Sequence, residues 1–201
     1  MLRGFGADPV AVDVFDARRL LEVVRSAQPQ IVMHQLTDLP MGLEPSRMAS
    51  AIARNARIRD EGTRNLLTAA AAAGARRVVA QSIAWAYAPG PEPHRENDAL
   101  DLGAVGSRAM SVRGIAALEY WTLNSPPFAG VVLRYGQLYG TGTGADRSGG
   151  SLPLHVDAAA HAAVLSIAKG APGIFNIVEP NDHVSSEKAA IQLGWHADFR
   201  R

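Results

Sequence analysis

The chain alternates between short runs of apolar and β-branched residues and longer segments in which apolar residues recur at helical spacing. Such alternation predicts right-handed crossovers, and therefore a parallel sheet with helices on both of its faces. In open α/β sheets of this kind, ligands bind beyond the carboxyl ends of the strands. The predicted strands are residues 10–15, 31–36, 78–82, 130–135 and 174–178.

Helix ends are marked by residues that cannot continue a helix or that tolerate a left-handed backbone. Gln28 and Pro29 stop the first helical segment, and Gly74 and Gly194 follow later ones. The segments 88–108 and 140–153 are rich in Pro and Gly and are predicted to be loops. The predicted helices are residues 17–27, 46–73, 112–123, 156–168 and 185–193.

Composition excludes several classes of protein. The 201 residues carry a formal net charge of +1, which gives no electrostatic reason to expect nucleic acid or an anionic membrane as partner. The absence of Cys excludes disulfides and thiolate chemistry. No apolar run approaches the ~20 residues of a membrane span, and the first residues do not form the apolar stretch of a signal peptide. We expect a cytoplasmic protein with no membrane partner.

Motifs near the predicted strand ends resemble one family when they are taken in order. They are VDVFDARRL, IVMHQLTDLP, EGTRNLLTAAAAAGARRVVAQSIAWAYAPG, LRYGQLYGTGTG, LHVDAAAHAA, GIFNIVEP and SSEKAAIQLGW. The array is similar to the NAD-dependent epimerase/dehydratase branch of the short-chain dehydrogenase/reductase superfamily, and most of all to an atypical bacterial subgroup. The resemblance implies a Rossmann-like fold, NAD or NADP as cofactor, a small-molecule substrate and oxidoreductase or epimerase chemistry.

The resemblance begins late in the family's pattern. Family members start with a strand, a GxxGxxG turn that grips the pyrophosphate, a helix and a second strand, roughly 60 residues in all. Gly4 and Gly6 precede the first predicted strand and do not replace that turn. The resemblance therefore implies an N-terminally truncated Rossmann-like domain over residues 1–140, and a small C-terminal substrate-side region over residues 141–201. We expect the dinucleotide to bind weakly or not at all.

Three explanations of the missing front end stay open. The chain is a truncated product, a naturally minimal relative, or a homodimer that fills its sheet by strand exchange or edge pairing. An unfilled gap would leave backbone groups unpaired and an apolar sheet edge exposed.

Some residues are candidates for the cofactor site because of where they fall in the motifs. Asp13 matches the family's acid at the adenine end of the dinucleotide, although a strand-end Asp also caps helices, a role that Asp16 fits better. His34 matches a histidine packed near the cofactor, and its alternative role is that of a hydrogen-bonded core residue. The full set of cofactor candidates is Asp13, Val14, His34, Gln35, Leu36, Gln81 and Tyr135.

The family's catalytic Tyr-x-x-x-Lys pair has no counterpart. With Glu119 as the anchor of the alignment, the tyrosine falls at Ser111 and the lysine at Ile115. Ser82 and Tyr87, which flank the loop after the QS strand, are the remaining candidates for polarising a substrate carbonyl and donating a proton. Ser82 could equally bond the backbone. For Arg134, the expectation is an ion pair with a neighbouring acid.

Two function classes follow from these residues. The first is an NAD(P)-dependent oxidoreductase or epimerase with a degenerate catalytic motif and weak or lost cofactor binding. The alternative is a non-redox cyclase, lyase or small-molecule binding scaffold that uses the same cleft. His155 and Asp157 do not share a helix face, whereas Asp157 and His161 could. Two ligands without a third do not make a metal site, so none is predicted, and no G-x-S-x-G motif indicates a hydrolase.

Overall fold

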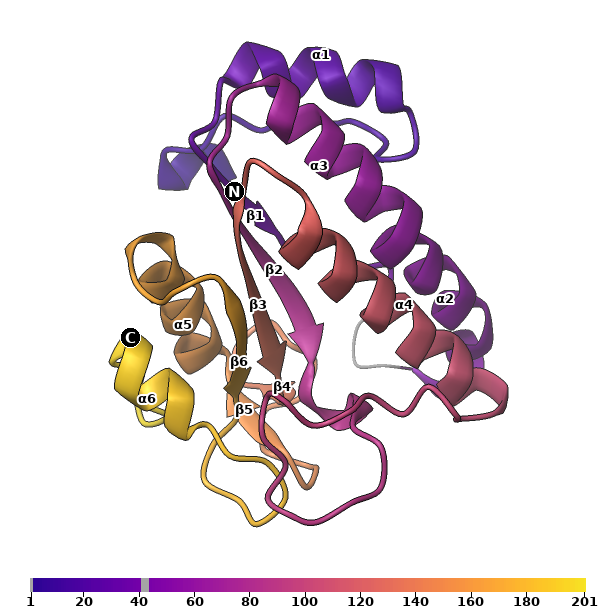
Figure 1. The fold of residues 1–201 in the computed structure, drawn as a ribbon, viewed down its shortest axis with the longest axis vertical. Helices are drawn as coiled ribbons and strands as arrows, with labels where there is room; N and C mark the ends of the chain where they lie inside the picture. Colours follow the sequence, from indigo (N-terminus) through magenta and orange to yellow (C-terminus); the bar gives the residue numbers. More distant parts are fainter. Residues whose placement is uncertain (1, 41–43) are drawn as a thin grey trace.

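A four-stranded parallel sheet forms the centre of the molecule (Figure 1). The computed structural model describes residues 2–40 and 44–201. The strand order is β1-β2-β3-β6, and every neighbouring pair is parallel, as the alternation predicts. The strands are β1 (Ile31–His34), β2 (Arg77–Ile83), β3 (Ala129–Tyr135) and β6 (Gly173–Ile177).

Helices cover both faces of this sheet, which confirms the Rossmann-like α/β class. On one face α4 packs on β2 and β3, with α2 and α3 against it and α1 against α3, whereas α5 and α6 lie on the other face (Figure 1). The helices are α1 (Ala17–Ala27), α2 (Pro45–Arg57), α3 (Thr63–Ala72), α4 (Gly106–Asn124), α5 (Val156–Ala168) and α6 (Glu187–Leu193).

The long helix predicted over 46–73 is present as α2 and α3 joined by a π-helical turn at Ile58–Gly62. A π turn fits one extra residue into the helix and so changes which side chains face inward. Ile58, Arg59 and Gly62 are buried by it. Gly74 follows at φ +85°, the left-handed conformation expected after a helix end.

The strand predicted over 10–15 is wrong. The chain there turns, with the amide of Asp16 bonded to the carbonyl of Asp13, and Val10 is 58% exposed. Its β-branched residues find no strand to pair with, and β-propensity acts only where a pleated neighbour is available. The segment instead packs on the long helix, where the carbonyl of Val14 accepts a hydrogen bond from Asn65 Nδ2 at 3.0 Å.

Two other helices begin at different residues from those predicted. Helix α4 begins at Gly106 rather than at Val112. The prediction missed its first residues because they include Gly and Ser, which favour a helix weakly and carry no apolar pattern. Helix α6 begins at Glu187, after Ser186 rather than Ser185. The bounds of α1 and α5 are those predicted.

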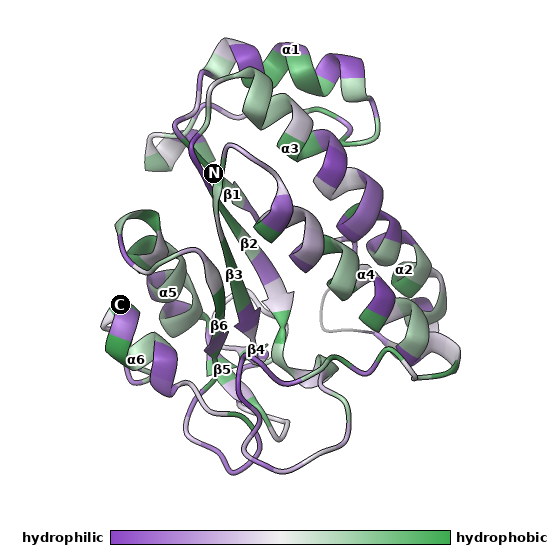
Figure 2. Cartoon of the chain, in the orientation of Figure 1, coloured by the Kyte–Doolittle hydropathy of each residue, from purple (hydrophilic) through white to green (hydrophobic). Residues whose placement is uncertain are grey.

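The core lies mainly between the sheet and α5. Val131, Leu133 and Phe175 are fully buried against the alanine-rich face of α5, and Figure 2 shows apolar residues along the strands. Small alanines let the helix approach the sheet closely. Within the described ranges, no helix is both long and apolar enough to cross a membrane.

Residues beyond 140 contribute to more than one part of the fold. They supply β6 of the main sheet and also β5 (Pro153–His155), which pairs with β4 (Gln137–Tyr139) in a small second sheet. The expected division of the chain at residue 140 stays a prediction.

Candidate functional site

The carboxyl ends of β1, β2 and β3 meet at one edge of the sheet, which we call the carboxyl edge. It is defined by His34, Ile83 and Tyr135, the last residues of the three strands. His34 pairs in register with Ala80, and Ile83 with Tyr135. Most of the predicted site residues therefore belong to this edge or to the loops that follow it.

A buried ion pair lies just inside the carboxyl edge, under α4. Arg134 Nε donates to Glu119 Oε1 at 2.8 Å, and its Nη2 donates to Glu119 Oε2 at 2.7 Å. Ser82, which pairs with Arg134 in register, donates its hydroxyl to Glu119 Oε1 at 2.6 Å. Ser82, Glu119 and Arg134, the central network, are all 5% exposed or less. The predicted ion pair of Arg134 with an acid is thus present.

The charge of Arg134 is held firmly in this network. Burial would lower the pKa of its guanidinium, but the hydrogen bonds and charge of Glu119 outweigh burial and raise that pKa above its usual value. Arg134 therefore stays cationic, and Glu119 neutralises it.

The central network bears on the predicted catalytic role of Ser82. Its side chain is 1% exposed, and its hydroxyl hydrogen points to Glu119 rather than into a cleft. The proposed catalytic role of Ser82 stays a prediction, and this hydrogen bond does not favour it.

Tyr87 is likewise engaged. Its hydroxyl donates to Asn176 Oδ1 at 2.7 Å, its ring stacks on His94 at 4.8 Å, and the Arg134 guanidinium lies 4.8 Å from the ring centroid. Burial raises the pKa of the Tyr87 hydroxyl, while Arg134 opposes the rise. Tyr87 thus ties the loop after β2 to β6, and its role as proton donor is untested.

The positions of the missing tyrosine–lysine pair lie on α4, at the turns that precede Glu119. Ile115 is fully buried and packs with Val112, Ala86 and the half-buried Trp85. Ser111 is half-buried. An apolar cluster therefore occupies the place where the family resemblance expects an ammonium group.

His34 is a neutral, hydrogen-bonded core residue in this structure. Its ring is 1% exposed, Nδ1 accepts from the amide of Leu36 at 3.3 Å, and Nε2 lies 2.8 Å from Thr63 Oγ1. Because Nδ1 accepts, we assign the ring hydrogen to Nε2, which donates to Thr63. Burial, with a smaller contribution from Arg59, lowers the pKa of His34 to about 4.

The other cofactor candidates divide into two groups. Asp13 is exposed, and its Oδ1 accepts from the amide of Phe15 at 2.9 Å, whereas Asp16 caps α1 through the amide of Arg19 at 3.0 Å. Val14 packs beside Gly62 of the π turn.

At the carboxyl edge, Gln35 and Leu36 are exposed and Gln81 is half-buried. Burial raises the pKa of the Tyr135 hydroxyl, which donates to the carbonyl of Ala159 at 2.9 Å, and the side chain of Gln35 opposes the rise. Gln35 and Tyr135 thus belong to the carboxyl edge, whereas Asp13 and Val14 precede α1, with Val14 packed against the long helix.

The described residues do not fit the diphosphate of a dinucleotide. Such a cradle is a glycine turn that joins a strand to the start of a helix. Gly6 (φ +79°) follows a short 3₁₀ turn at Leu2–Phe5, and Gly142 (φ +84°) lies between β4 and β5. Within residues 2–40 and 44–201, no glycine turn has the required strand-to-helix setting.

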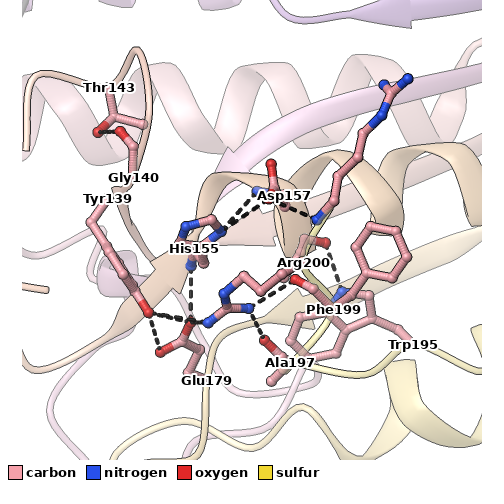
Figure 3. Close-up of polar contacts among 12 residues, drawn as sticks. Tyr139, Gly140, Thr143, His155, Asp157, Glu179, Trp195, Ala197, Phe199 and Arg200 are labelled. Carbon is pink, nitrogen blue, oxygen red and sulfur yellow. Dashed lines mark hydrogen bonds and ion pairs between the residues drawn. The ribbon is translucent and has the colours of Figure 1, made fainter. Parts of the chain in front are cut away.

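A second polar group, which we call the C-terminal cluster, joins the small sheet to the end of the chain. Figure 3 shows Tyr139, His155 and Arg200 converging on Glu179. Tyr139 Oη donates to Glu179 Oε1 at 2.9 Å, the amide of His155 donates to the same oxygen at 3.0 Å, and Arg200 Nη2 donates to it at 3.2 Å. This cluster anchors the C-terminal residues.

Sequence reasoning missed Glu179 and Arg200, because nothing in the pattern links positions so far apart in the chain. The side chains of His155 and Asp157 approach to 3.8 Å, while the ring of His161 stacks on Phe199. Among the described residues, no three His, Asp or Glu side chains are grouped as ligands for a metal.

The sheet, its helices and the carboxyl edge define a Rossmann-like α/β protein. The family model for the NAD dependent epimerase/dehydratase family matches residues 3–172. The chain therefore belongs to the NAD-dependent epimerase/dehydratase family, as the motifs imply.

A relative of known name supports the same assignment. The 3-diazoavenalumate denitrifying reductase of a Streptomyces species is 40% identical over 218 aligned residues, which cover 97% of this chain and 68% of the relative.

Solved structures share the fold at low sequence identity. RMD from Pseudomonas aeruginosa, complexed with NADPH, has a TM-score of 0.76 at 16% identity, over 96% of this chain and 84% of that one. UDP-glucose 4-epimerase from Thermotoga maritima, with UDP-glucose, has a TM-score of 0.73 at 16% identity, over 94% and 79%. These two structures of the same fold hold NADPH and UDP-glucose, respectively.

The buried neutral His34 predicts a pH-dependent stability. Its pKa is lower in the folded chain (about 4) than the ordinary value of 6.5, so the unfolded chain binds more protons between these values. The free energy of unfolding should be intact above pH 6.5 and should fall by about 3 kcal/mol as the pH drops to about 4. Denaturant titrations across this range measure the loss.

The variant His34→Gln should remove that part of the pH dependence, and His196→Gln, at an exposed position, should keep it. An unchanged pH slope in His34→Gln would show that other groups cause the loss.

Proposed function

We propose that this chain is a reductase that replaces a leaving group of its substrate by hydrogen, without a tyrosine–lysine proton relay. The observation that carries the proposal is Ile115, fully buried among apolar side chains where the family resemblance places the lysine. Ser111, at the tyrosine position, has a hydroxyl far too weakly acidic to replace a phenol.

The missing relay restricts the chemistry. Reduction of a carbonyl leaves an oxygen anion that needs a proton, and the relay supplies that proton. When a diazonium group takes up a hydride equivalent and departs as N₂, the product is a C–H bond and no oxygen requires a proton. The named activity of the Streptomyces relative, a denitrifying reductase of a diazo compound, belongs to this second kind. We therefore infer a diazo-bearing small molecule as the substrate class.

The chain's own residues would hold the substrate against the carboxyl edge. The central network fixes α4 to the sheet, and Arg134 also donates through Nη1 to the carbonyl of Glu96 at 3.3 Å. Glu96 in turn accepts from the amide of Asn176 at 2.9 Å. These bonds hold the loop between β2 and α4 beside the strand ends, where it forms one wall of the inferred site.

The cytoplasmic setting, the bacterial source and the homodimer remain predictions. So does binding of NAD or NADP by this chain, for which the described residues offer no diphosphate cradle.

The substrate class can be tested with a matched pair of compounds. The purified chain is mixed with millimolar NADH or NADPH and either an aryl diazonium compound or the corresponding aryl methyl ketone. We expect only the diazonium compound, and not the ketone, to be converted. Hydrogen should replace its diazonium group, and deuterium should appear at that carbon when the nicotinamide is deuterated. Mass spectrometry of the products gives both results.

Reduction of the ketone would contradict the proposal. Conversion of either compound without nicotinamide would favour the non-redox alternative. Chemical reduction of the diazonium compound is measured in reactions with bovine albumin in place of the chain, and a conversion no faster than this background would also overturn the proposal.

We further predict weak dinucleotide binding. Without backbone amides around the diphosphate, the chain loses the strongest contacts that a dinucleotide makes in this fold. Isothermal titration of the chain with NAD⁺ and with NADP⁺ should give dissociation constants weaker than micromolar. A micromolar constant for either would show that other residues grip the diphosphate.

A further inference from the structure

Arg59 is a buried cation that the central network does not use. It lies in the π turn, is 8% exposed, and belongs to the part of the long helix that packs against α4. Its neighbour Arg57 is an exposed residue that forms an ion pair with Glu61 at 2.7 Å. Of these two arginines at the start of the π turn, Arg57 thus faces solvent and Arg59 faces inward.

The described residues give Arg59 no hydrogen-bonding partner. Within residues 2–40 and 44–201, no oxygen accepts a hydrogen bond from its guanidinium, and the perturbation of its pKa has only two sources. Burial lowers that pKa to about 10, and the charge of Glu119 opposes the shift. Glu119, however, is already bonded twice by Arg134 and once by Ser82.

The buried charges around this point do not cancel. Among the described groups, Arg59 and Arg134 are cationic, Glu119 is the acid whose charge reaches both, and His34 is neutral. One positive charge is left over in a region of low dielectric constant, which is costly unless an anion compensates it.

The burial of Arg59 is not complete. Among the described side chains, His161 Nδ1 is the polar atom that is fully buried without a partner, and the Arg59 nitrogens are not of this class. Arg59 keeps 8% of its surface exposed. We infer that a ligand reaches the guanidinium through this exposed part.

The position of Arg59 places it at the carboxyl edge. It precedes Thr63, the partner of His34, by one helical turn, so the two lie on the same face of the helix. The helix between two parallel strands runs antiparallel to them, so one turn earlier means one turn further beyond the end of β1. The π turn that carries Arg59 also packs against α4, the helix that carries Ile115.

We propose that Arg59 binds a carboxylate group of the substrate at the carboxyl edge. The planar guanidinium matches a carboxylate through two parallel hydrogen bonds, and a single negative charge cancels the single excess positive charge. A phosphate dianion fits less well, because its two negative charges exceed the single excess positive charge of this region. Only the identification of this carboxylate as part of the substrate rests on the proposed function. The assignment adds a carboxylate group to the inferred substrate class.

The test uses binding of an aryl carboxylate without nicotinamide or any diazo compound. Cinnamate is titrated into the chain by calorimetry, and cinnamamide, its neutral counterpart, and inorganic phosphate are titrated at matched ionic strength. We expect cinnamate to bind and the other two to bind at least about tenfold more weakly, because a charge-assisted bond is lost.

Three variants separate the role of Arg59 from structural effects. Arg59→Met should weaken cinnamate binding on the order of tenfold to a hundredfold, Arg59→Lys should retain part of it, and Arg64→Met, which removes an exposed arginine paired with Asp60, should bind as the unaltered chain does. Because the charge of Arg59 is uncompensated in the free chain, Arg59→Met should also unfold at an equal or higher denaturant concentration.

Several outcomes would overturn the assignment. They are equal binding of cinnamate by Arg59→Met and the unaltered chain, tighter binding of phosphate than of cinnamate, and failure of Arg59→Met to fold, which would show that the charge is partnered inside the protein. The binding experiment measures no reduction, so its failure would overturn carboxylate binding by Arg59 and leave the reductase proposal standing. A chain that binds cinnamate through Arg59 but reduces no diazonium compound would overturn only the reductase proposal.

Discussion

The ion pair between Glu119 and Arg134 is the interaction on which the arrangement of the site depends. It joins α4 to β3 through two hydrogen bonds of 2.7 and 2.8 Å, and the hydroxyl of Ser82 adds β2 to the same carboxylate. Burial of two charges is costly, and this cost is met only where the geometry is good and the remaining oxygens are bonded. Here both conditions hold, so the helix is fixed in position and in rotation relative to the sheet.

That fixed helix determines what the carboxyl edge can do. Ile115 and Ser111 lie one and two turns before Glu119, so they are presented where the family resemblance expects a lysine and a tyrosine. In our proposal, the apolar packing of Ile115 leaves the carboxyl edge without the lysine of a proton relay, and His34, whose pKa is lowered to about 4, carries no imidazolium proton to donate near neutral pH. Glu119 is committed to Arg134, so among the described residues Arg59 is the buried cation left for a ligand. The reaction class and the ligand charge that we propose both depend on this fixed helix.

The sequence predicted the parts of the fold that depend on local pattern. The bounds of α1 are correct because it has a clear apolar face and Asp16 caps its start, and those of α5 because its alanine-rich run strongly favours a helix. The strands β1 and β3 are strongly apolar, although β1 ends at His34, two residues before the predicted end. The run at 10–15 has equal β-propensity but lacks a neighbouring strand, which no local pattern reports.

The site was less accessible from sequence. The ion pair of Arg134 was expected, but the hydrogen bond that turns Ser82 inward depends on α4, a partner remote in the chain. The burial of Arg59 depends on a π turn, which leaves no periodicity to recognise. Glu179 and Arg200 meet only because the C-terminal residues fold back onto the small sheet.

The central claim is that Glu119 and Arg134 neutralise each other and hold α4 on the sheet. A double-mutant cycle with Glu119→Gln, Arg134→Met and the double variant measures their coupling free energy directly by denaturant unfolding. We expect each single variant to lose about 3 kcal/mol or more, because each leaves a buried polar group or charge without its partner, and the double variant to lose much less than the sum. Losses that add to within about 0.5 kcal/mol would show that the two residues act independently, and would contradict this account.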